Sequence, residues 1–167
     1  MDTTATRSAA NGGAATRPLV VVRDLGLTRY ADALALQRNL HERRKRGEMG
    51  DTLLLTQHRP VFTLGSGADR ANLLAPEAEV RRRGIEVAAV ERGGDITYHG
   101  PGQLVAYPIL DLRGFGRDVH RYIRGLEQTA LDLLAAYGLT GARQAGAPGV
   151  RSVRARSRRS GSTSAAG

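Results

Sequence analysis

The 167-residue sequence contains no cysteine, which excludes disulfides, thiolate metal ligands and thiolate nucleophiles within these residues. Its four histidines, His41, His58, His99 and His120, are scattered and lack the spacing of a zinc site, so we expect no metal or other cofactor. No run approaches the ~18 consecutive apolar residues of a membrane-spanning helix, so we expect no membrane partner.

Lysine is nearly absent too, because Lys45 is the single one. The net charge of +9 therefore comes almost entirely from the excess of arginine over acidic residues. Residues 151–167 contain five arginines and no acidic residue, which leaves a mild excess of +4 on the remainder. The chain has only five tyrosines and two phenylalanines, with none in this basic tail, so aromatic stacking on bases is unsupported. We expect no specific nucleic-acid partner, although an Arg-rich nucleic-acid-binding protein remains an alternative.

Composition divides the chain into three parts. Residues 1–17 are rich in Ala, Thr and Gly and lack the apolar segment of a secretory signal, which predicts a disordered lead-in on a cytoplasmic protein. Residues 151–167 are Arg/Ser-rich with one sizeable apolar residue, which predicts a disordered tail. Residues 18–150 are therefore expected to form the folded domain.

Hydrophobic periodicity predicts interleaved strands and helices in this domain. Apolar side chains recur at helical spacing from Tyr30 and again from Val119, and each helix is followed by a glycine, Gly47 or Gly138. We predict strands at 18–23, 51–58, 61–64, 85–90 and 103–110, and helices at 30–46, 76–83 and 119–137. The fold class is therefore α/β or α+β, with a mixed sheet flanked by helices.

The best candidate site is the segment 92–103, which contains four glycines and a proline among twelve residues. Such a composition suits a loop whose backbone approaches a ligand closely. Arg92 and His99 flank Gly93 and Gly94 with a charged and a titratable group, and Tyr98 offers an apolar wall. Glycine-rich connections without a function are also common, and the segment matches no nucleotide-binding or nucleophile-elbow motif.

The whole run RGGDITYHGPGQLVAYPI, residues 92–109, resembles the signature of the octanoyltransferases of lipoate biosynthesis, the LipB family of lipoyl(octanoyl) transferases. The flanking segments QHRPVFTLG (57–65), ANLL (71–74) and GAPGV (146–150) agree with it. The resemblance covers roughly residues 18 to 150 and implies the biotin/lipoate protein ligase-like fold. It identifies 18–150 as the N-terminal part of an octanoyltransferase catalytic domain.

This resemblance implies transfer of an octanoyl group from octanoyl-acyl carrier protein to a lysine of lipoyl domains, the first step of protein lipoylation. The implied acceptors are the lipoyl domains of 2-oxoacid dehydrogenases and the glycine cleavage H protein. The mild positive charge outside the tail suits an acidic carrier protein. The implied substrate-binding positions are Arg92, Gly93, Gly94, Asp95, Ile96, Thr97, Tyr98 and His99.

The sequence departs from the family after the GAPGV segment, where the family has a catalytic cysteine and a lysine. Neither occurs beyond Val150 here. We therefore expect a chain truncated or frameshifted after Val150, a fold incomplete at its C-terminus, and no turnover by this chain alone. A non-catalytic acyl-binding paralogue is the alternative, whereas an ATP-dependent ligase of the same fold would need a lysine in its nucleotide site.

Overall fold

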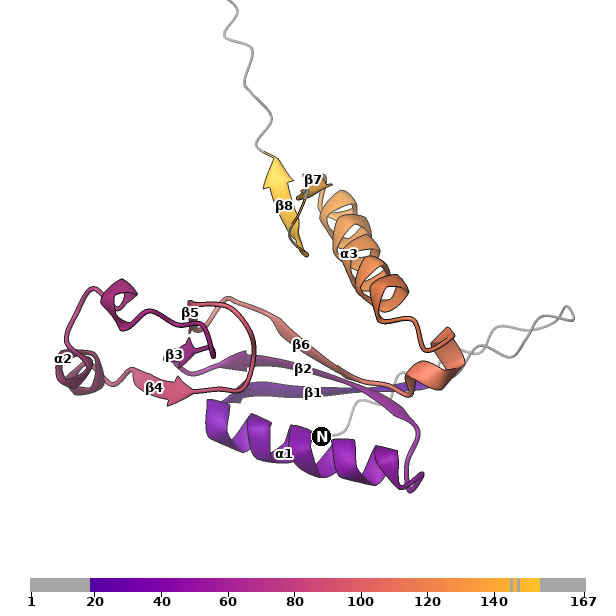
Figure 1. Cartoon of the computed structure of the whole chain (residues 1–167), viewed down its shortest axis with the longest axis horizontal. Coiled ribbons are helices and arrows are strands. Elements are labelled where there is room, and N and C mark those ends of the chain that lie inside the picture. Colours follow the sequence, from indigo (N-terminus) through magenta and orange to yellow (C-terminus); the bar gives the residue numbers. More distant parts are fainter. Residues whose placement is uncertain (1–18, 145, 147, 154–167) are drawn as a thin grey trace, which may run out of the picture. The chain divides into compact units, whose positions relative to one another are not determined.

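The computed structural model describes residues 19–144, 146 and 148–153. They form two compact units that divide after Asp111 (Figure 1). The first unit contains strands β1 (Val20–Thr28), β2 (Asp51–His58), β3 (Val61–Leu64), β4 (Glu86–Ala89), β5 (Ile96–His99) and β6 (Val105–Ile109), helices α1 (Tyr30–Lys45) and α2 (Glu77–Arg82), and the 3-10 helix η1 (Arg70–Asn72). The second contains the 3-10 helix η2 (Leu112–Phe115), helix α3 (Val119–Ala136) and strands β7 (Thr140–Arg143) and β8 (Val150–Val153).

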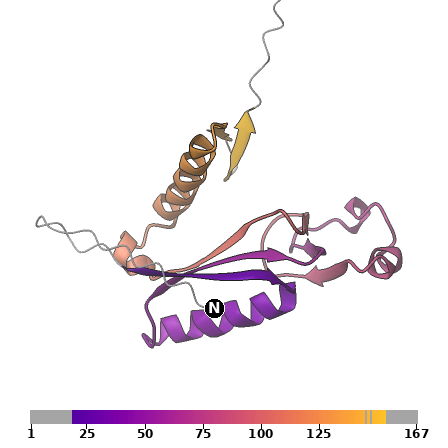
Figure 2. The same ribbon diagram turned by 180° about the vertical axis from the view of Figure 1, so that it is seen from behind.

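One sheet of the first unit has the strand order β1-β2-β6, with β1 parallel and β6 antiparallel to β2. Helix α1 runs alongside this sheet in both views (Figures 1 and 2). Leu40 of α1 packs with Leu54 of β2 and Ile109 of β6 in the buried core. The helical spacing of apolar residues from Tyr30 thus places one face of α1 on the sheet.

The face of β2 that α1 covers is largely polar. Thr52, Thr56 and His58 share it with Leu54 because side chains alternate along a strand, and each of the three is at most 1% exposed. The Thr56 hydroxyl donates to the carbonyl oxygen of Gly26 at 2.9 Å. Buried polar groups are tolerated when they are hydrogen-bonded in this way.

Arg44 joins three elements at the C-terminal end of α1. Its guanidinium lies 2.7 Å from a carboxylate oxygen of Asp51, at the start of β2, and 3.3 Å from one of Asp111, just after β6. The Asp51 carboxylate also accepts from the backbone nitrogen of Asp111 at 2.9 Å. The basic end of α1 therefore anchors the helix to the sheet as well as suiting the negative end of its dipole.

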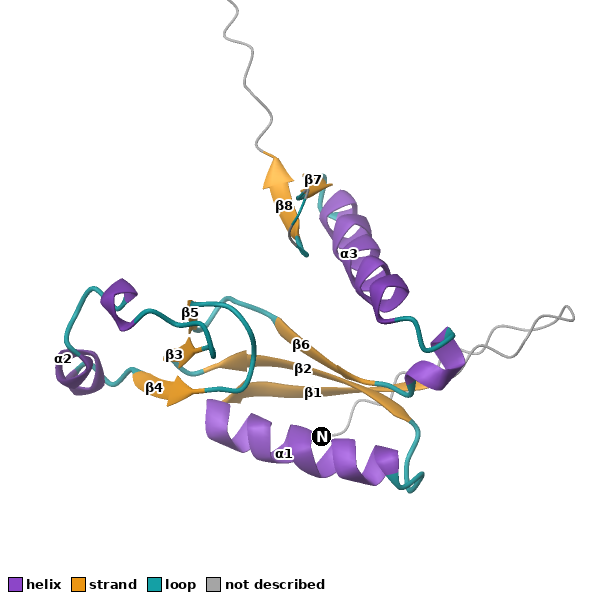
Figure 3. Cartoon of the chain, in the orientation of Figure 1, coloured by secondary structure: helices purple, strands orange, loops and turns teal. Residues whose placement is uncertain are grey.

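The second sheet of this unit has the order β4-β3-β5, with β4 parallel and β5 antiparallel to β3. Val61 lies opposite His99, and Leu64 opposite Ile96. Strand β5 therefore presents part of the glycine-rich segment directly beside β3. The loops that leave β3 and enter β5 are shown in teal in Figure 3.

The second unit is a helix that packs on a hairpin of β7 and β8. The Asp118 carboxylate accepts from the backbone nitrogen of Arg121 and caps α3, whereas Gly138, at φ 71°, follows its end. Gly141 of β7 approaches α3 so closely that a Cβ there would lie 2.6 Å from a methyl carbon of Leu134. A larger residue at this position would therefore force the side chains of Leu134 and Leu131 to shift.

The structure confirms the α+β class and the mixed sheet. The predicted strands and helices occur within a few residues of their expected bounds, but three strands were not predicted. The segment expected as a loop contains β5, because Ile96–His99 pairs with a strand that is distant in sequence. The prediction of a disordered tail is wrong for residues 151–153, which pair with β7 as part of β8, while residues 1–18 and 154–167 lie outside the described residues.

Candidate functional site

A cleft of about 730 Å³ opens in the first unit between α1, the two sheets and the segment that follows β4. Its wall combines aliphatic side chains with hydrogen-bonding and charged groups. The lining residues are Tyr30, Leu34, Gln37, Arg38, His41, Thr63, Ala89, Val90, Glu91, Arg92, Thr97, His99, Val105, Tyr107 and Ile109. Such a mixture suits a ligand with an apolar body and a polar end.

Two glycine-containing turns interlock beside this cleft. The backbone nitrogen of Ser66 donates to the carbonyl oxygen of Arg92 at 2.9 Å, and that of Gly67 donates to Gly94 at 3.3 Å. A Cβ at Gly65 would lie 2.2 Å from the Gly94 carbonyl oxygen, a distance that real Cβ atoms do not adopt. Gly65 is therefore required for the turn after β3 to reach the turn before β5.

Arg92 lies between these turns and the cleft. Its guanidinium donates to the Thr63 carbonyl oxygen at 2.9 Å and to the hydroxyl oxygens of Thr63 and Thr97 at 2.8 Å each. It also donates to the Gly93 carbonyl oxygen at 3.0 Å. Arg92 thus holds β3, β5 and the Gly93 turn together while one side of it borders the cleft.

Asp95 fixes the loop that precedes η1. Its carboxylate accepts from the backbone nitrogen of Asp69 at 3.1 Å and from the side-chain amide of Asn72 at 2.5 Å. The backbone N–H of Ile96, with these two donors and Arg92, holds the pKa of Asp95 below its ordinary value. Asp95 is therefore a carboxylate committed to loop contacts, and it does not line the cleft.

Strand β5 divides its side chains between two faces. Thr97 and His99 line the cleft, whereas Tyr98 points to the other face and packs against Phe62 with ring centroids 5.2 Å apart. His99 places Nδ1 2.6 Å from the side-chain oxygen of Gln103 and Nε2 3.4 Å from the Thr63 hydroxyl. Because an amide oxygen only accepts, Nδ1 of His99 carries the hydrogen in this arrangement.

A buried histidine lies behind the cleft. His58 is fully buried, and its Nε2 is 2.8 Å from the hydroxyl of Tyr107. Burial lowers the pKa of His58, and the electrostatic effect of the neighbouring His99 ring, whose centroid is 6.0 Å away, lowers it further. Burial likewise raises the pKa of Tyr107 to about 12, so both groups are neutral at pH 7.

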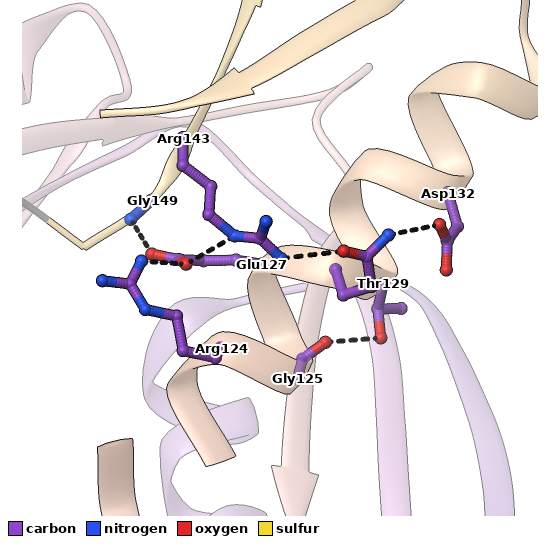
Figure 4. Close-up of polar contacts among 8 residues, drawn as sticks. Arg124, Gly125, Glu127, Thr129, Asp132, Arg143 and Gly149 are labelled. Carbon is purple, nitrogen blue, oxygen red and sulfur yellow. Dashed lines mark hydrogen bonds and ion pairs between the residues drawn. The ribbon is translucent and has the colours of Figure 1, made fainter. Parts of the chain in front are cut away.

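In the second unit, a carboxylate of α3 holds Gly149, the glycine that precedes Val150 (Figure 4). Glu127 is 4% exposed and accepts from the backbone nitrogen of Gly149 at 3.0 Å. Its other oxygen pairs with Arg124 at 2.7 Å and Arg143 at 3.1 Å. The Gly149 N–H and these arginines hold the pKa of Glu127 below its ordinary value.

The structure brings three of the eight sequence-predicted positions, Arg92, Thr97 and His99, to the cleft. The other five, Gly93, Gly94, Asp95, Ile96 and Tyr98, shape the turn and the strand around them. Tyr30, Gln37, His58, Thr63 and Tyr107 were not predicted as site residues. The one signal for the buried histidine was its position two residues from Thr56 and four from Leu54, on the same face of the strand.

Across the described ranges, no group of three or more His, Cys, Asp or Glu side chains is placed to hold a metal ion. None of the helices in these ranges has both the length and the apolar character needed to cross a membrane.

Comparison with known proteins identifies the family. Residues 29–157 match the model of the lipoyl protein ligase A/B catalytic domain, and the chain therefore belongs to this family. The resemblance to octanoyltransferases is confirmed at the level of individual relatives. The chain is 50% identical over 131 residues to an octanoyltransferase of Chloroflexus aurantiacus, with 78% of this chain and 59% of the relative covered. It is 54% identical over 119 residues to one of Rubrobacter xylanophilus, with 71% and 53% covered.

Solved structures confirm the lipoate ligase-like fold. A lipoate-protein ligase A solved with ATP aligns with a TM-score of 0.55 at 16% identity, over 80% of this chain and 52% of that protein. LipL1 of P. falciparum, solved with lipoate, aligns with a TM-score of 0.53 at 15% identity, over 72% and 38%. The chain thus spans a little over half the length of the octanoyltransferases that it resembles.

Proposed function

We propose that the first unit binds the octanoyl group of an acyl thioester in the cleft between α1 and β5. The observation that carries this proposal is the cleft itself, which combines an aliphatic wall with the side chains of Arg92, Thr97 and His99. These three side chains come from the segment that the sequence shares with the octanoyltransferase signature. The eight positions 92–99 accordingly act together, three by facing the acyl group and five by shaping the backbone around it.

The aliphatic residues of the cleft supply the driving force for chain binding. Leu34, Val90, Val105 and Ile109 line it together with Ala89. Burial of a methylene contributes about 0.8 kcal/mol, so the six methylenes of an octanoyl group supply at most about 5 kcal/mol. An acetyl group has no methylene to bury, and it should therefore bind far more weakly.

The reaction that we propose for the family member is transfer of the octanoyl group from octanoyl-acyl carrier protein to a lysine amine of a lipoyl domain. The 167 residues contain no cysteine, and the single lysine, Lys45, is exposed on α1 and does not line the cleft. These residues therefore recognise the acyl group and orient it, without a sulfur nucleophile of their own. We expect the chain alone to bind but not to transfer.

The proposed partners follow from this reaction and from charge. Octanoyl-acyl carrier protein is the donor, and the lipoyl domains of 2-oxoacid dehydrogenases and the glycine cleavage H protein are the acceptors. The net positive charge of the chain favours encounter with an acidic carrier. We place this function in the cytoplasm, where the donor and acceptor proteins meet.

Calorimetric titration of the chain with S-octanoyl-N-acetylcysteamine tests the proposal. This thioester carries the octanoyl group without the carrier protein, and the S-acetyl compound is its control. We expect saturable binding of the octanoyl compound and at least tenfold weaker binding of the acetyl compound. Equal affinity for the two compounds, or no saturation by the octanoyl compound at millimolar concentration, would contradict acyl recognition.

A further inference from the structure

One ion pair joins two walls of the cleft. Arg38, on α1, lies 3.5 Å from Glu91, on the segment that follows β4, and both side chains line the cleft. This separation is longer than an ordinary N–H···O bond of about 2.9 Å, so the pair is loosely held. The Arg38 side chain is 65% exposed and that of Glu91 is 93% exposed, so a ligand in the cleft can reach both charged groups.

A second ion pair joins the same two regions outside the cleft. Arg29, the residue before α1, lies 3.0 Å from Glu86 at the start of β4, and neither residue lines the cleft. Exposed pairs of this kind contribute little to stability, so opening either one should leave the fold intact. The two pairs therefore differ chiefly in whether a ligand in the cleft can contact them.

The ion pair of the cleft lies beside the residues proposed to face the acyl carbonyl. Glu91 directly precedes Arg92, so their Cα atoms are about 3.8 Å apart. Burial raises the pKa of Tyr30, and the charges of Arg92 and Arg38 oppose this rise, so both guanidinium groups lie near the same hydroxyl in the cleft. A ligand whose carbonyl is held by Arg92 therefore has its polar end close to the ion pair.

The arm of a carrier-type thioester has groups that match this pair. A thioester of the pantetheine type continues beyond its sulfur with two methylenes and a secondary amide. In an extended arm the amide nitrogen lies about 5 Å from the thioester carbonyl carbon. A trans amide is planar, and its N–H and C=O point to opposite sides. A cation on one wall of the cleft and a carboxylate on another can therefore bind the two groups at once.

We propose that the Arg38–Glu91 pair opens to receive an amide of the arm that carries the acyl thioester. Arg38 donates to the amide carbonyl oxygen, and Glu91 accepts from the amide N–H. This inference rests on the proposed acyl-binding function and adds to it the groups that recognise the arm. The cleft therefore selects octanoyl thioesters of pantetheine-type thiols over octanoyl thioesters that lack an amide.

The opening that this binding requires is modest. Two ordinary hydrogen bonds across an amide place the guanidinium nitrogen and the carboxylate oxygen about 8 Å apart. Both side chains have several rotatable bonds and lie in solvent, so rotamer changes alone can separate them to this distance. The ligand then replaces one loose contact with two charge-assisted hydrogen bonds, which are stronger than bonds between neutral groups.

The test compares two octanoyl thioesters that differ in one group. S-octanoyl-N-acetylcysteamine contains the amide, whereas 2-(octanoylthio)ethyl acetate has an ester in its place, with the carbonyl retained and the N–H absent. The variants are Glu91→Met and Arg38→Met, which remove the proposed acceptor and the proposed donor. Glu86→Met is the matched control, because it removes the carboxylate of the ion pair that lies outside the cleft.

Calorimetric titration measures the preference for the amide. We expect the wild type to bind the amide compound about fivefold more tightly than the ester, because an ester oxygen cannot donate to Glu91. Glu91→Met should reduce this preference to less than about twofold, whereas Glu86→Met should retain it in full. Arg38→Met should weaken both compounds by about threefold, since each retains the carbonyl oxygen that Arg38 binds.

Equal affinity of the wild type for the two compounds, or a preference that survives in Glu91→Met, would overturn the assignment of the N–H to Glu91. Unchanged binding of both compounds by Arg38→Met would overturn the assignment of the carbonyl oxygen to Arg38. In each of these results the octanoyl compounds still bind, so acyl recognition itself would stand. A wild type that binds neither compound would refute the acyl site and this inference with it. Glu91→Ala provides the same comparison if the methionine variant does not fold.

Discussion

Substitution of Gly65 by alanine tests whether the interlocked turns after β3 and before β5 maintain the cleft. The added Cβ would lie 2.2 Å from the Gly94 carbonyl oxygen and 3.0 Å from that of Arg92. Both contacts are with backbone, so the turns must separate rather than a side chain move aside. Separation breaks the backbone hydrogen bonds that Gly65, Ser66 and Gly67 donate across the pair.

The magnitude follows from these bonds. Each backbone hydrogen bond contributes a net ~0.5–1.5 kcal/mol, so losing three costs about 2–4 kcal/mol. A glycine-to-alanine change also reduces the conformational entropy of the unfolded chain, which stabilises the folded state by about 0.4–1 kcal/mol and offsets part of this loss. The free energy of unfolding of Gly65→Ala should therefore fall by about 1–3 kcal/mol, and octanoyl-thioester binding should weaken because Arg92 moves with its turn.

Urea unfolding followed by circular dichroism measures this change, and Gly93→Ala is the matched control. Gly93 belongs to the same pair of turns, but a Cβ there meets no atom within 4 Å. The Gly65 variant should lower the unfolding midpoint by about 1 M, given a slope of about 1–3 kcal/mol per molar urea. The Gly93 variant should be as stable as the wild type or slightly more so. If the two variants unfold at the same urea concentration, the close approach of the turns does not contribute to stability.

Two further predictions concern buried ionisable groups. The pKa of His58 is lowered in the folded state, so its stabilising contribution is present above the ordinary value of 6.5 and is lost as the pH falls through the folded value. The urea midpoint of the wild type should therefore decline from pH 7.5 to pH 5.5, and His58→Phe should flatten that decline; an unchanged slope would show that other groups cause it. The pKa of Glu127 is lowered from 4.5, chiefly by the Gly149 N–H, so acid below that value should destabilise α3 and the β7–β8 hairpin. Glu127→Gln should remove this acid sensitivity. At pH 7 it should also lower the temperature at which the amide resonances of the β7–β8 hairpin lose their folded positions in NMR spectra. A variant that melts at the same temperature as the wild type would contradict the role of the ion pairs.

The helices could be predicted from sequence because their signal is local. The apolar spacing from Tyr30 and from Val119 repeats over four or more turns, and a glycine follows the C-terminus of each helix. Strand β5 could not be recognised, because four residues between glycines carry little periodicity and its pairing partner β3 lies more than thirty residues earlier. Strand β8 was missed for a similar reason, since the arginine-rich composition after Val150 outweighed the weak alternation of its four residues.

Part of the candidate site could be predicted from the sequence. Arg92 and His99 stood out because charged and titratable residues beside glycines suit a ligand loop, and both line the cleft. Gln37 and Tyr107 did not, because they lie on a helix and a strand that meet only through the packing of α1 on its sheet. The segment 92–99 also divides into positions that face the cleft and positions that shape the backbone, a division that requires the pairing of β5 with β3.

The ion pairs of Arg44 have a consequence for changing ligand preference. They hold the first residue of β2 to α1 and to the end of β6, while His58, the last residue of β2, is bonded to Tyr107 of β6. Both ends of the central strand are thus tied to the same neighbouring strand, and β2 cannot slide lengthwise without breaking polar bonds at each end. Cleft length should therefore be altered by substituting Leu34 or Arg38 on α1, which leaves these ties intact, rather than by substitutions within β2.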